Sequence, residues 1–396
     1  MSSSTLDQLV LVANARMPSV RAQSLQVAQV AAAFSRAGVK TTLLHALRHP
    51  TPSLPEGQDL FDYYAVPTER RPDVVALPNI DWIDRVPTRA QFIPARIQEL
   101  SFGRKAARWI RKTKPNAWVL SRELETARNL VKGKAKQPVF LEIHRVPAGA
   151  LRRKWLLEAA QKSGGVVAIS GGVREDLIEL GIAADSIVVE HDAVEASRFA
   201  NSPSKAEARS SLNIPLDQPV VVYTGGLMMW KGVDILVAAA RRLPNYRFVI
   251  AGGMPSDLER IQAQTLDLNN LRLDGFQAPE KVALYLAAGD LGVVPNRSTP
   301  AISAKYTSPL KAFESMAAGL PLVASDLPAL REILIGDDHA VFVAPDSDQA
   351  LAEGIERLMN DSELRSRMAQ CGRERVAETT WDARAVRLIK WMEARA

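Results

Sequence analysis

The feature that most constrains the fold of this 396-residue chain is a repeated alternation of short apolar runs with segments of helical period. The chain opens with an apolar run at 8–14, an Ala- and Val-rich segment at 24–37 and a second apolar run from Val39. Parallel strands need a crossover connection, which is usually a helix, so this order is typical of a parallel sheet. The pattern predicts an α/β fold with a ligand crevice at the carboxyl ends of the strands.

The alternation occurs in two series. In the first, Pro-rich residues in the 50s to 90s lack a period, and we expect them to cross the surface. Residues 201–219 then turn to Ser, Pro, Ala and charged residues with no apolar period, and six strand-like runs follow from Val220. We predict two doubly wound, Rossmann-like domains, at 1–200 and 201–379, that face a central cleft, with a C-terminal helix at about 380–396 packing back on the first.

Composition excludes several classes of protein. A hydrophobic content of 47% and a charged content of 24% are typical of a folded globular enzyme. The single cysteine, Cys371, permits no internal disulfide, and the absence of metal-binding motifs predicts no metal site. The start of the chain lacks a basic-then-apolar leader, and no apolar run reaches about 20 residues, so we expect a cytoplasmic protein.

Positive charge is concentrated in one segment. The net charge is +6, and residues 101–150 hold 12 basic and 3 acidic residues. Within 104–114 six cations occur without an acid, and Trp109 lies among them. This segment is either a solvated helix face or a surface that contacts anionic lipid. Nucleic acid is disfavoured, because no recognition-helix motif or aromatic-rich strand accompanies the charge.

A glycine pair follows the first strand-like run of the second series. Gly225 and Gly226 would let the backbone approach an anion, and Lys231 could reach the same anion as a point charge. An ordinary turn at the end of a strand would also explain the two glycines.

The segment 306–319 predicts a helix start that binds an anion. Ser308 is a plausible N-cap and Pro309 suits the first helical position, so the amides of Leu310 and Lys311 would be free. Glu314 is an unusual residue for an apolar helix face. It would either accept hydrogen bonds from the two hydroxyls of a ribose or pair with Lys311 at i+3.

In the first series, His144 closes the apolar run at 139–143. A polar residue at the carboxyl end of a parallel strand lies where ligands bind. A structural histidine with its hydrogen bonds satisfied is the alternative.

Several segments resemble the retaining, GT-B fold glycosyltransferases of family 4, within glycosyl transferases group 1. In the second series the resemblance lies in their nucleotide-sugar-binding domain, at 221–240, 249–253, 273–295 and above all 308–334. In the first series, residues 16–34, 166–170 and 191–199 are similar to the first loop and helix and to the domain-closing strand and linker.

The resemblance implies a hexosyltransferase that uses a nucleoside-diphosphate sugar with retained configuration, without an obligatory metal or other cofactor. Lys231 would pair with the diphosphate, Glu314 would hold the ribose, and amides near Leu310 and Lys311 would meet the distal phosphate. His144 would face the transferred sugar. Further donor-binding residues are implied at Arg21, Ser24, Gly225, Gly226, Gly252 and Ser308.

Two positions depart from the family pattern. Gly226 stands where the family has an arginine, and Tyr306 stands where it has a glutamate. Arg21, Arg297 or Lys311 would have to replace the arginine. We expect a glycan, lipid-linked or small-molecule acceptor, a role in surface polysaccharide biosynthesis, and peripheral contact with the inner face of the cell membrane through 104–114. The alternatives are a phosphorylase or epimerase, or a catalytically silent protein that binds sugar nucleotide or scaffolds other transferases.

Overall fold

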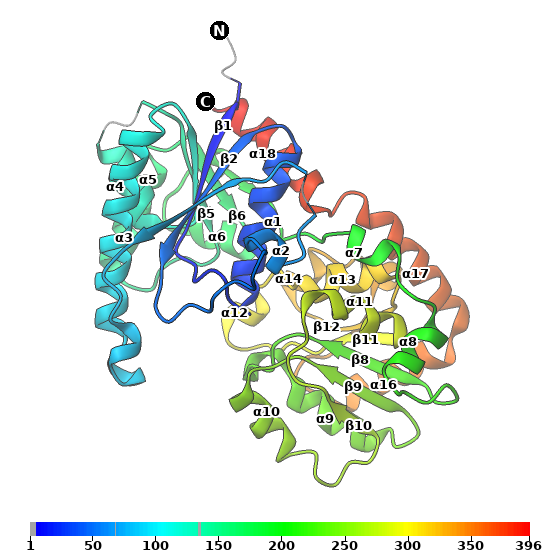
Figure 1. Ribbon diagram of the computed structural model, residues 1–396. Helices are drawn as coiled ribbons and strands as arrows, with labels where there is room; N and C mark the ends of the chain where they lie inside the picture. Colours follow the sequence, from blue (N-terminus) through cyan, green and yellow to red (C-terminus); the bar gives the residue numbers. More distant parts are fainter. Residues whose placement is uncertain (1–4, 68, 134–135) are drawn as a thin grey trace. The chain divides into compact units, whose positions relative to one another are not determined.

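The computed structural model describes residues 5–67, 69–133 and 136–396. The chain divides into two compact units, each with its own parallel sheet (Figure 1). The first unit comprises the chain up to Ile169 together with Val173–Glu190 and Trp381–Ala396, and the second comprises Ser170–Gly172 and His191–Thr380. The units therefore change at Glu190–His191, and the boundary predicted after residue 200 lies inside the second unit.

The first unit contains seven parallel strands in the order β3-β2-β1-β4-β5-β6-β7. The order reverses between β1 and β4, and ligands of doubly wound sheets bind outside the carboxyl ends of the strands at such a switch point. The inner strands are almost wholly apolar because helices cover both faces. The strands are β1 (Gln8–Ala13), β2 (Lys40–Leu47), β3 (Asp73–Pro78), β4 (Trp118–Ser121), β5 (Val139–Ile143), β6 (Gly165–Ala168) and β7 (Ile187–Val189).

The segment expected to cross the surface contains the edge strand β3, so that expectation was incomplete. Its residues alternate between exposed and half-buried, and Val74 is 42% exposed. An edge strand packs on fewer neighbours than a central one, so its apolar signal is weak. The α-helices are α1 (Ala22–Arg36), α2 (Leu60–Tyr63), α3 (Phe92–Thr113), α4 (Leu124–Lys132), α5 (Ala150–Ala160), α6 (Gly171–Glu179), which begins in the second unit, and α18 (Trp381–Glu393).

The C-terminal helix α18 packs within the first unit, beside α1 (Figure 1). The Trp391 ring lies 5.5 Å from the Phe140 ring. Gly165, at a φ of +156°, permits this packing, since a Cβ there would lie 2.6 Å from the Trp391 ring. The last helix is thus part of the core of the first unit.

The second unit contains six parallel strands in the order β10-β9-β8-β11-β12-β13, with the switch point between β8 and β11. Separate apolar clusters cover the two faces, one with α9 and α16 and one with α11 and α13. The strands are β8 (Val220–Thr224), β9 (Arg247–Ala251), β10 (Leu271–Leu273), β11 (Leu291–Val294), β12 (Leu322–Ser325) and β13 (Val341–Val343). The helices are α7 (Ser197–Ala200), α8 (Lys205–Ser211), α9 (Val233–Arg242), α10 (Pro255–Gln262), α11 (Pro279–Ala288), α12 (Ala301–Ala304), α13 (Leu310–Ala318), α14 (Pro328–Arg331), α15 (Gly336–His339), α16 (Asp348–Asn360) and α17 (Ser362–Val376).

The polar segment at 201–219 contains a core element, contrary to the sequence prediction. Ser204 and Glu207 form a capping box that starts helix α8. Arg209 is buried and donates hydrogen bonds to Asp290 and to the carbonyl oxygen of Ala288. A buried, fully paired arginine can anchor a helix that has little apolar surface, and apolar periodicity cannot detect it.

Candidate functional site

Glycines bring two strand ends of the second unit into close contact. Gly225 follows β8 and Gly252 follows β9, and both have a φ of +128°. A Cβ on Gly252 would lie 2.1 Å from the carbonyl oxygen of Gly225. Gly225 also donates from its backbone N to the carbonyl oxygen of Ala251 at 2.9 Å. The glycines therefore let the backbone segments after β8 and β9 meet at the carboxyl edge of the sheet, next to the switch point. The N–H groups of Gly225 and Gly252 are both used within the protein, on the carbonyl oxygens of Ala251 and Gly275.

A tight turn at Gly232 positions Lys231. Gly232 has a φ of +67°, and a Cβ there would lie 1.8 Å from the carbonyl oxygen of Pro295, directly after β11. The Nζ of Lys231 lies 3.9 Å from the ring centroid of Trp230. Burial lowers the pKa of Lys231 to about 8. The lysine therefore stands beside the loops that follow both strands of the switch point.

Lys311 is a buried cation in the first turn of α13. It is 7% exposed, and its Nζ has no hydrogen-bond partner among the described residues. The Nζ lies 3.8 Å from the ring centroid of Tyr223, and its Cε is 3.7 Å from the place of a Cβ on Gly225. Burial, together with the charge of Lys231, lowers the pKa of Lys311 well below its usual range. A buried ammonium without an anion is costly, so this arrangement favours an anionic ligand.

The three residues suggested to replace the family arginine at Gly226 differ in their location and in whether their charge is already paired. Arg297 pairs with Asp234 and Asp346, so its charge is used within the protein. Arg21 belongs to the first unit. Lys311 alone has its charged group unpaired beside the glycine loop in the described part of the second unit.

The start of α13 differs by one residue from the prediction. The N-cap is Pro309, without a side-chain cap, and the helix begins at Leu310. Ser308 does not cap the helix, because its Oγ accepts a hydrogen bond from the backbone N of Asp192 at 2.8 Å. Ala312 is the first residue to donate backward, to the carbonyl oxygen of Pro309. The amides of Leu310 and Lys311 thus stand at an uncapped helix N-terminus.

Glu314 lies one turn further along α13. Within the described chain no ion pair joins it to Lys311, and no hydrogen-bond donor reaches its carboxylate, so the predicted i+3 pair does not form. Burial raises the pKa of Glu314, and the charges of Arg198 and Lys311 oppose that rise. The carboxylate is therefore available to accept hydrogen bonds from a ligand.

Asn296 was not singled out from the sequence. It follows β11, is fully buried, and neither polar atom of its side chain has a partner among the described residues. The sequence could have indicated it, because Asn296 is a polar residue directly after an apolar strand at the switch point.

In the first unit, His144 follows β5 and is 30% exposed. Its Nε2 lies 2.8 Å from Oε1 of Glu142, and its Nδ1 lies 3.4 Å from Nη2 of Arg122. Burial and the charge of Arg122 lower the pKa of His144 to about 4. The imidazole is therefore neutral at neutral pH, with both ring nitrogens in contact with charged neighbours that sequence reasoning missed.

Arg21 and Ser24 have different environments at the start of α1. Arg21 is exposed. Ser24 is buried, and its hydroxyl donates to the carbonyl oxygen of Arg16 at 2.8 Å. The hydroxyl of Ser24 thus holds the loop after β1, while Arg21 remains open to solvent.

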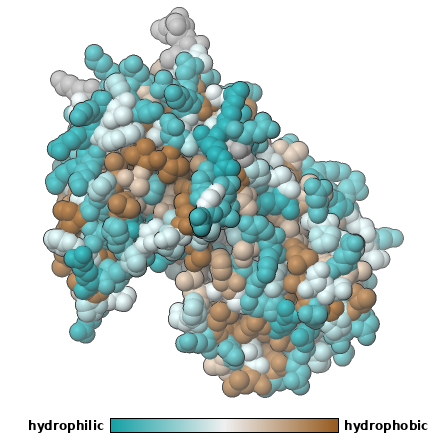
Figure 2. Space-filling model, in the orientation of Figure 1, coloured by the Kyte–Doolittle hydropathy of each residue, from teal (hydrophilic) through white to brown (hydrophobic). Residues whose placement is uncertain are grey.

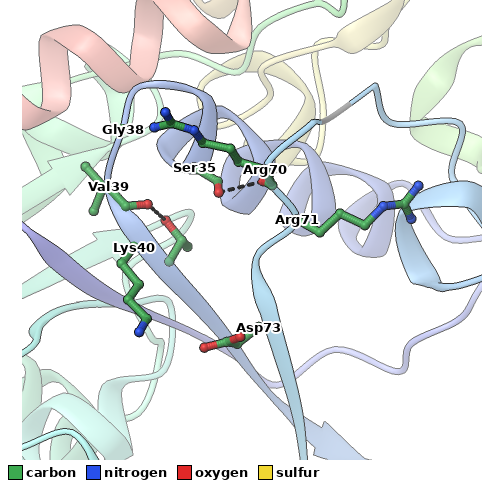
Figure 3. Close-up of a pocket in the computed structure, with 8 residues that line it drawn as sticks. Ser35, Gly38, Val39, Lys40, Arg70, Arg71 and Asp73 are labelled. Atoms are coloured by element: carbon green, nitrogen blue, oxygen red, sulfur yellow. Dashed lines mark hydrogen bonds between the residues drawn. The ribbon is translucent and has the colours of Figure 1, made fainter.

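A cavity of about 290 Å³ in the first unit lies elsewhere (Figure 3). It is lined by Lys40 and Asp73, which begin β2 and β3, so it lies at the amino edge of the sheet. Ser35 donates to the carbonyl oxygen of Arg70 there, and Arg71 pairs with Asp59 and Asp62 at the start of α2. The position and the internal pairing do not suit the predicted site.

Among the described residues no cluster of His, Cys, Asp and Glu could hold a metal ion. The same part of the chain has no helix with the length and hydropathy needed to cross a bilayer.

Residues 204–375 match the model of the family described as glycosyl transferases group 1, and they contain Gly225, Lys231, Lys311 and Glu314. These residues form a glycosyl transferases group 1 domain. The match includes the whole β8–β13 sheet, so the family pattern and the switch point coincide.

Curated relatives match only part of the chain. α-D-Kanosaminyltransferase of Streptomyces kanamyceticus is 30% identical over 172 residues, which is 42% of each protein. A D-inositol 3-phosphate glycosyltransferase of Xylanimonas cellulosilytica is 28% identical over 57% of this chain and 56% of the relative. The chain spans about half the length of the curated relatives it matches.

Solved structures match nearly the whole chain. Sucrose-phosphate synthase from Thermosynechococcus elongatus has a TM-score of 0.75 at 20% identity, covering 97% of this chain and 98% of that structure. HepE of Anabaena in complex with UDP has a TM-score of 0.74 at 16% identity, covering 98% and 100%. The prediction of an α/β GT-B fold with two Rossmann-like domains is confirmed.

Proposed function

We propose that this chain is a glycosyltransferase that moves a sugar from a nucleoside-diphosphate sugar to a hydroxyl-bearing acceptor. The observation that carries the proposal is the buried, unpaired Nζ of Lys311 at the switch point of the second unit. It stands with Lys231 beside a glycine loop and an uncapped helix N-terminus. A diphosphate would satisfy all of these groups at once.

The proposed chemistry follows from where charge develops. As the bond between sugar and phosphate breaks, the leaving nucleoside diphosphate gains negative charge. Lys231, Lys311 and the amide of Leu310 would stabilise that charge, and this is the role of a preorganised oxyanion site. The carboxylate of Glu314 would accept hydrogen bonds from the ribose diol. Since two lysines supply the positive charge, the proposal includes no metal ion and no cofactor besides the donor.

We also propose a hexose donor and retention of anomeric configuration. The resemblance to family 4 supports both. One structural neighbour is HepE in complex with UDP and glucose, at a TM-score of 0.73.

The acceptor that we propose is a lipid-linked glycan of surface polysaccharide biosynthesis, reached at the inner face of the cell membrane. One neighbour in fold is a lipopolysaccharide outer core galactosyltransferase. Helix α3 runs along one side of the first unit, where Figure 2 shows hydrophilic and hydrophobic residues together at the surface. Its second half exposes Arg104, Arg108 and Arg111 at spacings of three and four residues, which places them on one face. Its first turn exposes Phe92 by 73% and Ile93 by 55%.

Cosedimentation with vesicles tests the membrane contact. Changing Arg104, Lys105, Arg108 and Arg111 to Ser should abolish binding to vesicles that contain anionic lipid, because each cation near such a surface contributes about 1 kcal/mol. A matched control changes four exposed cations elsewhere, Arg153, Lys154, Lys162 and Lys281, to Ser. Equal loss in both variants, or equal binding to neutral vesicles, would leave α3 as a solvated face.

A nucleotide-sugar screen tests the proposed function. The donor should raise the melting temperature, since ligand at a hundredfold its Kd stabilises the folded state by about 2.7 kcal/mol. The same donor should be hydrolysed slowly without acceptor and its sugar transferred with acceptor. Stabilisation without hydrolysis or transfer would support a silent sugar-nucleotide-binding protein, to which the departures at Gly226 and Tyr306 point.

A further inference from the structure

We propose that Arg384, on the C-terminal helix α18, is a positioning residue that orients His144 by way of the Glu142 carboxylate. The inference rests on the proposed function, in which His144 faces the transferred sugar. Arg384 itself would touch neither donor nor acceptor.

The two oxygens of Glu142 have separate partners. Oε1 lies 2.8 Å from Nε2 of His144 and 3.4 Å from Nε of Arg122. Oε2 lies 3.1 Å from Nη2 of Arg384. The side chains of Glu142 and Arg384 are each only 2% exposed. One carboxylate therefore joins a residue of α18 to the imidazole at the end of β5.

Arg384 keeps that carboxylate charged. Burial alone would raise the pKa of Glu142, but the charge of Arg384, the hydrogen bond from His144 and the charge of Arg122 hold the pKa well below its usual range. An ionised carboxylate only accepts hydrogen bonds, so Nε2 of His144 must carry the proton. Nδ1 is then the acceptor that meets Nη2 of Arg122. The tautomer and the ring orientation of His144 follow from these contacts.

The same charges keep the imidazole neutral. The charged groups that face it are Glu142 on β5, Arg122 after β4 and Arg384 on α18. Burial and the two arginines outweigh the carboxylate, and the pKa of His144 falls to about 4. Glycosyl transfer develops positive charge on the sugar, as in the oxocarbenium-like transition states of glycoside hydrolysis. An imidazolium beside that sugar would oppose the reaction, whereas a neutral, oriented imidazole would not.

The fold places Arg384 with precision. It is 1% exposed and is among the largest fully buried side chains. Its Nη2 also contacts the carbonyl oxygen of Glu190 at 3.4 Å. The Trp391 ring fixes the same helix on Phe140. The helix therefore has little freedom to move the guanidinium away from Glu142.

The experiment compares Arg384→Met with Arg387→Met, a control in the same helix. Arg387 pairs with Glu190 at 2.8 Å and is 46% exposed, so this control removes an ion pair that does not touch Glu142. ¹⁵N NMR of histidine-labelled protein reports the tautomer and titration of each of the five histidines, and His144→Gln identifies the His144 signal. Transfer kinetics of wild type are measured first.

Arg384→Met should shift the His144 tautomer or raise its titration midpoint, and should lower kcat about tenfold at similar KM, as expected for a misplaced group. Arg384→Lys retains the positive charge and should therefore largely restore the His144 signal and kcat. Arg387→Met should leave the His144 signal unchanged. Because breaking a buried ion pair can unfold a protein, Arg384→Met with Glu142→Gln is the second variant. It removes both members of the pair, and Glu142→Gln alone is its reference, since Arg122 also loses the carboxylate.

An unchanged His144 signal in both Arg384→Met variants would overturn the inference, as would kinetics equal to those of Arg387→Met. A wild type without transfer activity would instead refute the proposed function. The NMR signal does not depend on turnover, so the two failures are distinguishable.

Discussion

The two switch points of this molecule use polar residues in opposite ways. In the first unit, Gln98 is 1% exposed, exchanges hydrogen bonds with Asn14 and donates to Asn79. The backbone N of Asn14 donates to Glu123 at 3.1 Å. In the second unit, Lys311 and Asn296 are buried with polar atoms that have no partner in the described chain.

The difference indicates which sheet edge awaits a ligand. A satisfied network stabilises the protein that contains it, whereas buried polar groups without partners cost free energy that a ligand can recover. The switch point of the first unit is thus held by its own side chains, and that of the second has buried polar groups that an anion would satisfy. The predictions below test this contrast.

Lys231→Ala should have the largest effect. Removing one group that stabilises developing charge typically costs about a hundredfold or more in turnover. We expect a loss of that size in kcat with little change in melting temperature, measured by steady-state transfer kinetics. Lys281→Ala, at an exposed position of the same unit, is the control. If turnover stays near that of the control, Lys231 does not stabilise the diphosphate and our assignment of this residue is wrong.

Lys311→Met should separate ligand binding from stability. Methionine has a similar shape and leaves no buried charge, so the free protein should melt at the same or a higher temperature. Donor affinity, measured by calorimetry, should fall about tenfold, as for the loss of one charge-assisted contact. A lower melting temperature with unchanged donor affinity would mean that Lys311 stabilises the folded protein and does not bind the donor.

Glu314→Gln should have a smaller effect. The amide retains the volume of the carboxylate but replaces one acceptor with a donor, so one ribose hydroxyl loses its partner. Donor KM should rise roughly threefold to tenfold, the equivalent of about one hydrogen bond. The control is Glu259→Gln, exposed on α10. Unfolding of the variant with normal nucleotide binding would contradict the ribose assignment.

The pH dependence of donor affinity should be the mildest signal. The pKa of Lys231 is about 8 in the folded protein and near 10.4 in an unfolded chain. Affinity should therefore decline as pH rises through about 8, and binding there should take up a proton. Between these two values the unfolded chain binds more protons, so the contribution of Lys231 to stability rises with pH. Calorimetry in buffers of different ionisation enthalpy measures the uptake. Lys231→Met should reduce it, and the remainder belongs to Lys311, whose pKa is also lowered.

Local pattern determined much of this protein. The alternation of apolar runs with helical segments predicted two parallel-sheet domains, because side-chain period and crossover geometry are local constraints. The glycine loop, Lys231 and the 308–319 segment could be selected from sequence, since strand ends and helix starts have recognisable residues. The edge strand β3 and helix α8 were missed, because a half-exposed strand and a helix anchored by the buried Arg209 lack a strong apolar period.

Only the tertiary structure decided which charges are paired. The sequence could not show that Arg297 is neutralised by Asp234 and Asp346 while Lys311 is not, nor that Ser308 serves Asp192 instead of capping α13. It also could not bring Arg384 to Glu142 across 242 residues. Hydrogen bonds and burial depend on which segments meet in three dimensions. The sequence therefore determines which charged and polar groups are present. Packing determines whether each group pairs within the protein or remains available to a ligand.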